Sequence, residues 1–170
     1  MKNLEEFLVF SLDDQYYALR LGAVERVVRA VEVTPLPNAP EIVRGIINVQ
    51  GRIVPVIDLR RCFRFPEREI RLSDQFVISS VSQREVVFAV DEVHGVVRCT
   101  EEAVVPVAEI FPGIGTVKGV MKFTAGMVII TDLDKVLYPV EESRPDEGLT
   151  ELDCLGTETG DKLSERGNGC

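Results

Sequence analysis

The chain has 170 residues, of which 45% are hydrophobic and 28% charged, a composition typical of a globular protein with one domain or two small ones. Its formal net charge of −9 argues against a nucleic-acid partner, because an acidic chain releases no counterions from a phosphate backbone. No apolar run approaches the roughly 20 residues of a membrane-spanning helix, and the N-terminus lacks the features of a signal peptide, so a cytoplasmic location is expected.

The first 45 residues are predicted to hold strands, a loop and short helical turns. Residues 7–12 and 16–21 form a predicted hairpin around a polar turn. Residues 22–29 fit either a helical turn or a third strand, because their valines suit both periods. Residues 34–40 contain three prolines and are expected to be an extended loop, followed by a short helix over 41–45.

Three further hairpins are predicted from alternating apolar runs around polar turns. They cover residues 46–59, 76–93 and 121–133. The first turns at Gln50 and Gly51, and its return strand contains Pro55, which has no backbone N–H to donate. Pro55 is therefore expected at a sheet edge or a bulge.

The sequence also contains an internal repeat. Residues 7–28 align without gaps on 76–97, at an offset of 69, and residues 45–59 align on 119–133, at an offset of 74. Two ungapped blocks in the same order indicate duplication. Each half supplies about five short strands, and closing them into a small barrel hides the exposed edges. The predicted fold class is all-β, with two five-stranded barrels that share a core.

Residues 141–170 differ from the rest of the chain. They are polar and rich in glycine, with nine acidic and three basic residues. Such a composition offers little apolar surface to bury, so we expect a disordered acidic tail. Six arginines lie closer to the centre of the chain. We expect them to be solvated at a strand end and in a loop, with an anion-binding patch as the alternative: Arg52, Arg60, Arg61, Arg64, Arg68 and Arg71.

No pattern typical of catalysis or metal binding is present. The four cysteines form no CxxC pair and His94 is the only histidine, which argues against a zinc site. Asp58 and Asp132 end equivalent strands of the two halves, which indicates turn capping. We therefore expect a protein that is not an enzyme and needs no cofactor. An apolar groove between the barrels would suit an amphipathic helix of a partner.

Three stretches resemble the CheW-like chemotaxis coupling (adaptor) protein family. They are EFLVFSLDDQYYALRLGAVERVV (6–28), PNAPEIVRGIINVQGRIVPVIDL (37–59) and VFAVDEVHGVV (87–97). The resemblance covers about residues 5–140, and the frame PxxPxxxxGxxNxxGxxxPVxDL is its most specific part. It implies two SH3-like β-barrels around a common core, the first mainly 14–67 and the second mainly 76–137.

The same resemblance implies the function and the partners. Such proteins are adaptors without enzymatic activity, which join the cytoplasmic tip of methyl-accepting chemotaxis receptors to the regulatory domain of a CheA-type histidine kinase. They are recruited to receptor arrays. A kinase-docking regulator without receptor coupling is the alternative, and a small-barrel oligonucleotide binder is a third, weaker one because the chain is acidic and has no tryptophan.

Site residues follow from the resemblance position by position. The expected receptor-binding set is Val24, Arg26, Val27, Gly45, Gln50, Val77, Ile78 and Val96. A plain core role is an equal alternative for Val27, Val77 and Ile78. The kinase surface is expected on the first barrel, with Asn48 and Arg52 beside its turn.

This sequence departs from the family pattern at two of these positions. The family commonly has an acid where Arg26 stands and an arginine where Gln50 stands, and the two can pair near the receptor surface. Here that pair cannot form, but Arg26 and Gln50 can share a hydrogen bond. A specialised paralogue with its own receptor or output is one interpretation, and drift at a tolerant surface pair is the other.

Overall fold

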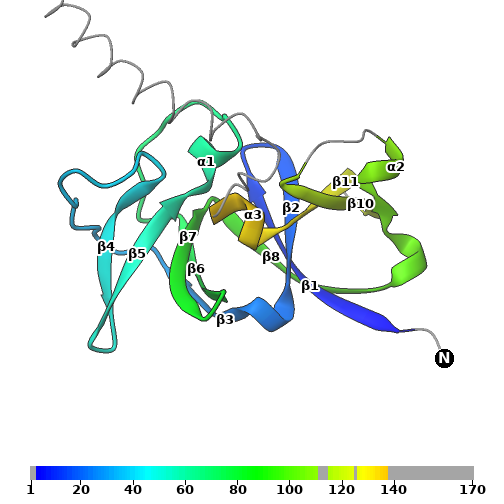
Figure 1. Ribbon diagram of the computed structural model, residues 1–170, viewed down its shortest axis with the longest axis horizontal. Helices are drawn as coiled ribbons and strands as arrows, with labels where there is room; N and C mark the ends of the chain where they lie inside the picture. Colours follow the sequence, from blue (N-terminus) through cyan, green and yellow to red (C-terminus); the bar gives the residue numbers. More distant parts are fainter. Residues whose placement is uncertain (1–2, 111–114, 125, 138–170) are drawn as a thin grey trace, which may run out of the picture. The chain divides into compact units, whose positions relative to one another are not determined.

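The described part of the chain is built almost wholly from strands (Figure 1). The computed structural model describes residues 3–110, 115–124 and 126–137. The strands are β1 (Leu4–Leu12), β2 (Gln15–Arg20), β3 (Val24–Arg29), β4 (Val43–Val49), β5 (Arg52–Asp58), β6 (Gln75–Val81), β7 (Arg84–Val90), β8 (Glu92–Thr100), β9 (Val105–Pro106), β10 (Val117–Phe123) and β11 (Gly126–Thr131).

Helical elements are short. They are η1 (Leu21–Ala23), α1 (Leu59–Cys62), η2 (Glu101–Ala103), α2 (Val107–Ile110) and α3 (Leu133–Leu137). No helix of the described residues has the length and apolar content that crossing a bilayer requires. The expected tail, residues 141–170, lies outside the described residues.

The strands form two sheets that exchange hairpins between the two halves of the sequence. One sheet has the order β3-β6-β7-β5-β4, and the other has the order β8-β1-β2-β11-β10-β9. Parallel pairing of β7 with β5, and of β2 with β11, places the first hairpin of each half in the sheet of the other half. The sheets therefore do not divide at the expected boundaries, 14–67 and 76–137, because each sheet needs strands from both halves.

Both sheets close by the same device, which supports the internal repeat. After β3 the chain crosses to the far edge, where Thr34 N donates to Ile46 O at 3.0 Å and Ile46 N donates to Thr34 O at 2.9 Å. In the other sheet β9, which follows β8, pairs with β10. At each crossing the strand that is crossed carries a glycine, Gly45 on β4 and Gly119 on β10. A Cβ at Gly45 would lie 2.2 Å from Thr34 O, and one at Gly119 would lie 2.7 Å from Val105 O.

Three clusters of buried side chains fill the fold. One lies inside the five-stranded sheet and includes Phe76 and Val54, and a second lies inside the six-stranded sheet and includes Phe7 and Val128. The third, the central cluster, draws on β1, β2, β5, β6, β7 and α3. Since it contains strands of both sheets, the prediction of two β subdomains around a shared core is confirmed.

Two local predictions need correction. The helix expected over 41–45 is instead a turn that leads into β4, where β-branched Val43, Ile46 and Ile47 favour the extended chain. Pro55 does not lie on an edge strand, because β5 runs between β7 and β4. The missing N–H of Pro55 removes no hydrogen bond to β7, because the pairing of β5 with β7 begins only at Val56.

Candidate partner-docking surfaces

The first candidate surface lies where the two sheets meet, and we call it the junction surface. Its half-buried apolar side chains pack against the central cluster: Leu21, Val24, Val27 and Val93. Val96 on β8 stands directly opposite Leu8 of β1, a member of the same cluster, yet it is 49% exposed. A cavity of about 610 Å³ opens beside η1 and is lined by Leu4, Glu5, Glu6, Arg20, Leu21, Gly22, Ala23 and Ser80.

The junction surface gathers three of the residues expected to bind a receptor, Val24, Val27 and Val96. The expectation is wrong for Val77 and Ile78, whose side chains are 0% and 2% exposed and belong to the buried clusters. It is also wrong for Gly45 as a contact residue. Gly45 is buried beneath Thr34, and its φ of 152° and its crossing backbone explain why no side chain stands there.

The second candidate surface is the tip of the β4–β5 hairpin, which we call the hairpin surface. Gln50 and Gly51 both have positive φ, 50° and 87°, as a two-residue hairpin turn with the twist of the flanking strands requires. Asn48 Oδ1 accepts a hydrogen bond from Gly51 N at 2.7 Å. Asn48 therefore stabilises the turn, and its side-chain oxygen is already engaged.

Arg26 fastens this tip to β3. Its Nη2 atom donates to Gln50 Oε1 at 3.0 Å, which confirms the predicted hydrogen bond between these two exposed side chains. Arg26 supplies a guanidinium, but Gln50 supplies a neutral amide where an ion pair would need a carboxylate. The contact therefore keeps the geometry of a bridge while carrying only one formal charge.

Arg52 is held by two glutamates rather than being free. Its Nη2 atom lies 2.9 Å from Glu85 Oε2 and 3.8 Å from Glu25 Oε1. A hydrogen bond between the carboxyls of Glu25 and Glu85, together with burial, raises the pKa of Glu85 although Arg52 opposes the shift. Arg52 thus serves first to compensate two neighbouring carboxyl groups.

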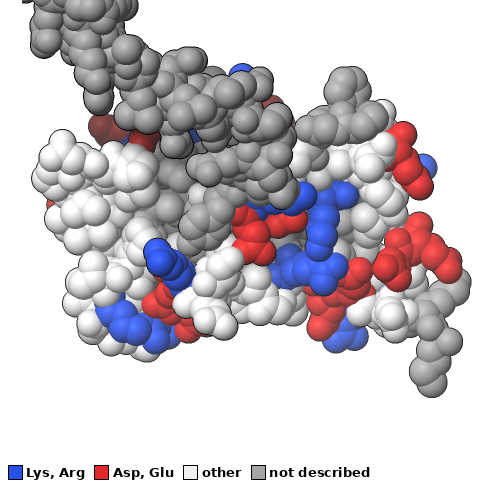
Figure 2. Space-filling model, in the orientation of Figure 1, with Lys and Arg blue, Asp and Glu red and all other residues white. Residues whose placement is uncertain are grey.

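Ile53 is the apolar residue that this tip presents to solvent. Its side chain is 64% exposed and stands opposite Asn48 on the same face of the hairpin. Figure 2 shows charged side chains of both signs near the lower end of the hairpin and a mostly uncharged surface further up over β4. Ile53 therefore adds exposed apolar area to a tip whose charged side chains are already compensated.

A chain of ion pairs connects the two sheets, and we call it the inter-sheet ion network. Arg60, which is 6% exposed, contacts Asp13 and Asp91, and Arg68 contacts Asp91 and Asp74. The hydrogen bond from Arg60 holds the pKa of Asp13 below its ordinary value. Burial alone would raise the pKa of Asp74, but bonds from Arg68 and from Arg71 N lower it overall. The expectation of solvated arginines is therefore wrong for Arg60.

The chemistry of these groups is structural. Asp58 Oδ1 accepts from the backbone N–H groups of Arg60 and Arg61 at 3.0 and 3.4 Å, which confirms that it caps α1. Burial raises the pKa of the Cys62 thiol to about 11, so the thiol stays protonated near neutral pH. Within residues 3–110, 115–124 and 126–137, no group of three histidine, cysteine or carboxylate side chains is placed to hold a metal ion.

Sequence reasoning missed two residues, one on the hairpin surface and one in the inter-sheet ion network. Ile53 belongs to the run RIVPVIDL, whose apolar residues do not alternate, and that irregularity was the available signal that one of them faces solvent. Arg60 gave no signal of its own, because its carboxylate partners come from a turn 47 residues before it and a strand end 31 residues after it.

Comparisons with known proteins agree with this architecture. The model of the CheW-like domain family matches residues 6–141. The chain is 31% identical over 147 residues to "Chemotaxis protein CheW" of Thermotoga maritima, which covers 85% of this chain and 93% of that protein. It is also 31% identical over 112 residues to "Protein FrzA" of Myxococcus xanthus, covering 64% of each chain.

A solved structure gives the same result in three dimensions. The scaffolding protein TtCheW from Thermoanaerobacter tengcongensis superposes with a TM-score of 0.71 at 31% identity, over 83% of this chain and 95% of that one. The family match spans residues 6–141, and the Thermotoga and Thermoanaerobacter proteins match 85% and 83% of the chain. The chain therefore belongs to the CheW family of non-enzymatic chemotaxis scaffolding proteins.

Proposed function

We propose that this protein is a cytoplasmic adaptor that couples methyl-accepting chemotaxis receptors to a CheA-type histidine kinase and joins them in receptor arrays. The observation that carries the proposal is the presence of two separate surfaces on one shared core, the junction surface and the hairpin surface. A protein that only docked on a kinase would need one of them.

The junction surface fits the helical tip of a receptor. Its half-buried leucine and valines offer apolar area around the central cluster, and the cavity beside η1 adds a space of about 610 Å³. Charged side chains at the rim, Glu5 with Arg20 and Glu6 with Arg98, are paired with each other at 2.9 and 2.8 Å. An amphipathic helix can therefore bury its apolar stripe there without leaving a rim charge unpaired.

The hairpin surface fits the regulatory domain of the kinase. Ile53 offers an apolar contact, and Asn48 and Arg52 are held in place beside it, Asn48 by a hydrogen bond and Arg52 by an ion pair. Pre-ordered side chains lose little conformational entropy when a partner binds. This favours a rigid protein surface as the partner over a flexible segment.

A binding experiment with two separate partners tests the proposal. Tagged full-length protein would be mixed with a receptor cytoplasmic hairpin, with the kinase regulatory domain, and with both together. One complex that retains both partners supports the adaptor. Binding of the kinase domain alone would instead support the alternative, a kinase-docking regulator, and binding of neither would reject both functions.

We also propose that the protein serves its own receptor or its own output, such as surface motility or gene control. The specific support is the Arg26–Gln50 hydrogen bond, which stands where the resembling family commonly has an ion pair. Arg26 lies on β3 between Val24 and Val27 of the junction surface, and the pair is open to solvent, so a receptor bound at that surface can sense its charge. If the pair arose by neutral drift, changing its charge should leave receptor choice unaltered.

A further inference from the structure

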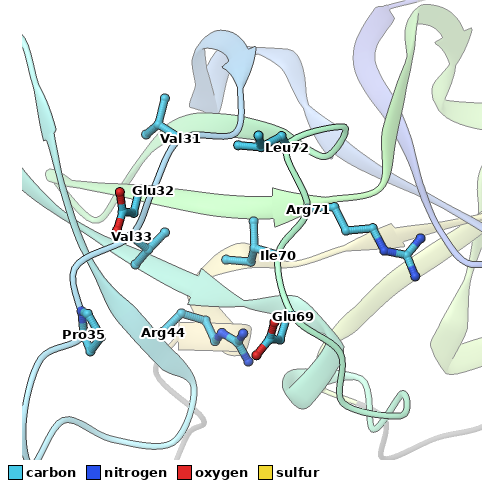
Figure 3. A pocket seen from close by; sticks show the side chains of 9 residues that line it. All are labelled: Val31, Glu32, Val33, Pro35, Arg44, Glu69, Ile70, Arg71 and Leu72. Carbon is cyan, nitrogen blue, oxygen red and sulfur yellow. The ribbon is translucent and has the colours of Figure 1, made fainter.

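A groove beside the five-stranded sheet plays no part in the function proposed above. One wall is the segment that leaves β3, with Val31 and Val33, and the other is the loop before β6, with Ile70 and Leu72. The groove has a volume of about 450 Å³. Figure 3 shows Val33 and Ile70 across the groove from one another.

The floor of the groove is apolar and firmly supported, while its upper walls are exposed. Val33 and Ile70 are half-buried and pack against the cluster inside the five-stranded sheet. Val31 is 50% exposed and Leu72 is 77% exposed. Two such large apolar side chains facing one groove offer a partner more buried area than isolated surface residues do.

A backbone hydrogen bond joins the two walls at one end, and at the other end the first wall is held to β4 instead. Ala30 N donates to Asp74 O at 3.0 Å, which joins the segment after β3 to the loop before β6, and Thr34 exchanges hydrogen bonds with Ile46 of β4. Between these points the backbone groups of 31–33 and of Ile70 and Leu72 make no backbone hydrogen bond to another described residue. An extended peptide can therefore pair with backbone here, as in the addition of a strand to a sheet edge.

The charges around the groove favour a positively charged partner. The carboxylates of Glu32 and Glu69 have no ion pair or hydrogen bond with any described residue. Of the two arginines at the rim, Arg44 is compensated by Asp58 at 3.4 Å and Glu67 at 3.8 Å, and Arg71 extends away from the groove (Figure 3). The uncompensated charge is therefore negative.

From these observations we propose that the groove binds an extended segment of a partner protein in which apolar residues alternate with lysine or arginine. The apolar side chains enter the floor between Val33 and Ile70, and the basic side chains reach Glu32 and Glu69. This surface is separate in its residues from the junction and hairpin surfaces, so the proposal stands or falls independently of the adaptor function.

The test uses the intact chain and a defined peptide. A fluorescent seven-residue peptide of alternating lysine and valine is titrated against the protein, with a glutamate–valine peptide as the control ligand. We expect binding of the lysine peptide alone. Amide shifts in NMR spectra should concentrate at 31–33 and 69–72.

Matched variants separate the groove from general attraction to an acidic protein. Glu32→Lys with Glu69→Lys should raise the Kd about tenfold or more, whereas Glu101→Lys with Glu109→Lys, which changes the net charge equally at exposed positions elsewhere, should raise it less than about twofold at 0.15 M salt. Leu72→Ser, at an exposed position, should also weaken binding without lowering the melting temperature. Equal weakening by both double variants, or no binding, overturns the proposal.

Discussion

Arg60 Nη2 lies 2.7 Å from Asp13 Oδ1, a contact between α1 and the turn that joins β1 to β2. The contact joins the two sheets, because α1 directly follows β5 of the five-stranded sheet and the turn joins two strands of the six-stranded sheet. The same nitrogen lies 2.7 Å from Asp91 Oδ2. A buried guanidinium therefore links α1 to the β1–β2 turn and to Asp91 between β7 and β8.

Removal of this guanidinium should destabilise the fold. Arg60→Met leaves Asp13 and Asp91 without their common partner, and we expect a loss of about 2–3 kcal/mol in the free energy of unfolding, at the low end for buried pairs because both carboxylates are partly exposed. Urea unfolding gives the value. Arg98→Met, which removes an exposed pair with Glu6, should cost less than about 1 kcal/mol, and similar losses in the two variants would contradict a special role for Arg60.

Acid should weaken the inter-sheet ion network. The pKa values of Asp13 and Asp74 are both lowered from 3.8, so each group stabilises the folded state above that pH and loses its contribution as the pH falls through its folded pKa. Urea midpoints should change little through these groups between pH 7 and 5 and decline below about pH 4. Asp74→Asn should flatten the decline, whereas Asp14→Asn, at an exposed turn position, should leave it unchanged.

The two crossing glycines should tolerate no side chain. Gly45→Ala and Gly119→Ala place a Cβ 2.2 and 2.7 Å from a carbonyl oxygen, so each should cost about 1–3 kcal/mol of unfolding free energy. Gly22→Ala is the control, since no atom beyond its two chain neighbours lies within 4 Å of its Cβ position, and it should change stability by less than about 0.5 kcal/mol. Wild-type melting of Gly45→Ala together with lost receptor binding would restore Gly45 as a contact residue.

A charge on the junction surface should block the receptor and spare the fold. Val96→Asp introduces a carboxylate at a half-exposed position, and desolvating it against a helix should weaken receptor-hairpin binding about tenfold or more. Met127→Asp, at a 59% exposed position of β11, provides the matched control. Isothermal titration with the receptor hairpin makes the comparison, and equal losses in both variants would argue against a receptor site at the junction.

Restoring a charge pair at the hairpin should alter receptor choice. Arg26→Glu with Gln50→Arg replaces the 3.0 Å hydrogen bond by an ion pair between exposed residues, so stability should change by less than about 1 kcal/mol. The relative affinities for a panel of receptor tips should change instead. An unchanged ranking across the panel would favour drift over specialisation.

The strands, the turns and the repeat were predictable because their signals are local. Alternating valines specify strands and the Gln50–Gly51 turn specifies a chain reversal, each within a few residues, and the repeat follows from aligning one half of the sequence on the other. The capping role of Asp58 and the Arg26–Gln50 hydrogen bond were also accessible, the first from its strand-end position and the second from a family resemblance.

Partners at long range were decided by the tertiary structure. No local pattern says that β2 pairs with β11 and β7 with β5, so the exchange of hairpins between halves was not foreseen. The tertiary structure also buries Val77 and Ile78, covers Gly45 with Thr34 and brings Arg60 to Asp13, while it leaves Ile53 and Val96 in solvent. Residue type sets which side chains favour burial, but only the pairing of distant strands determines which of them are covered.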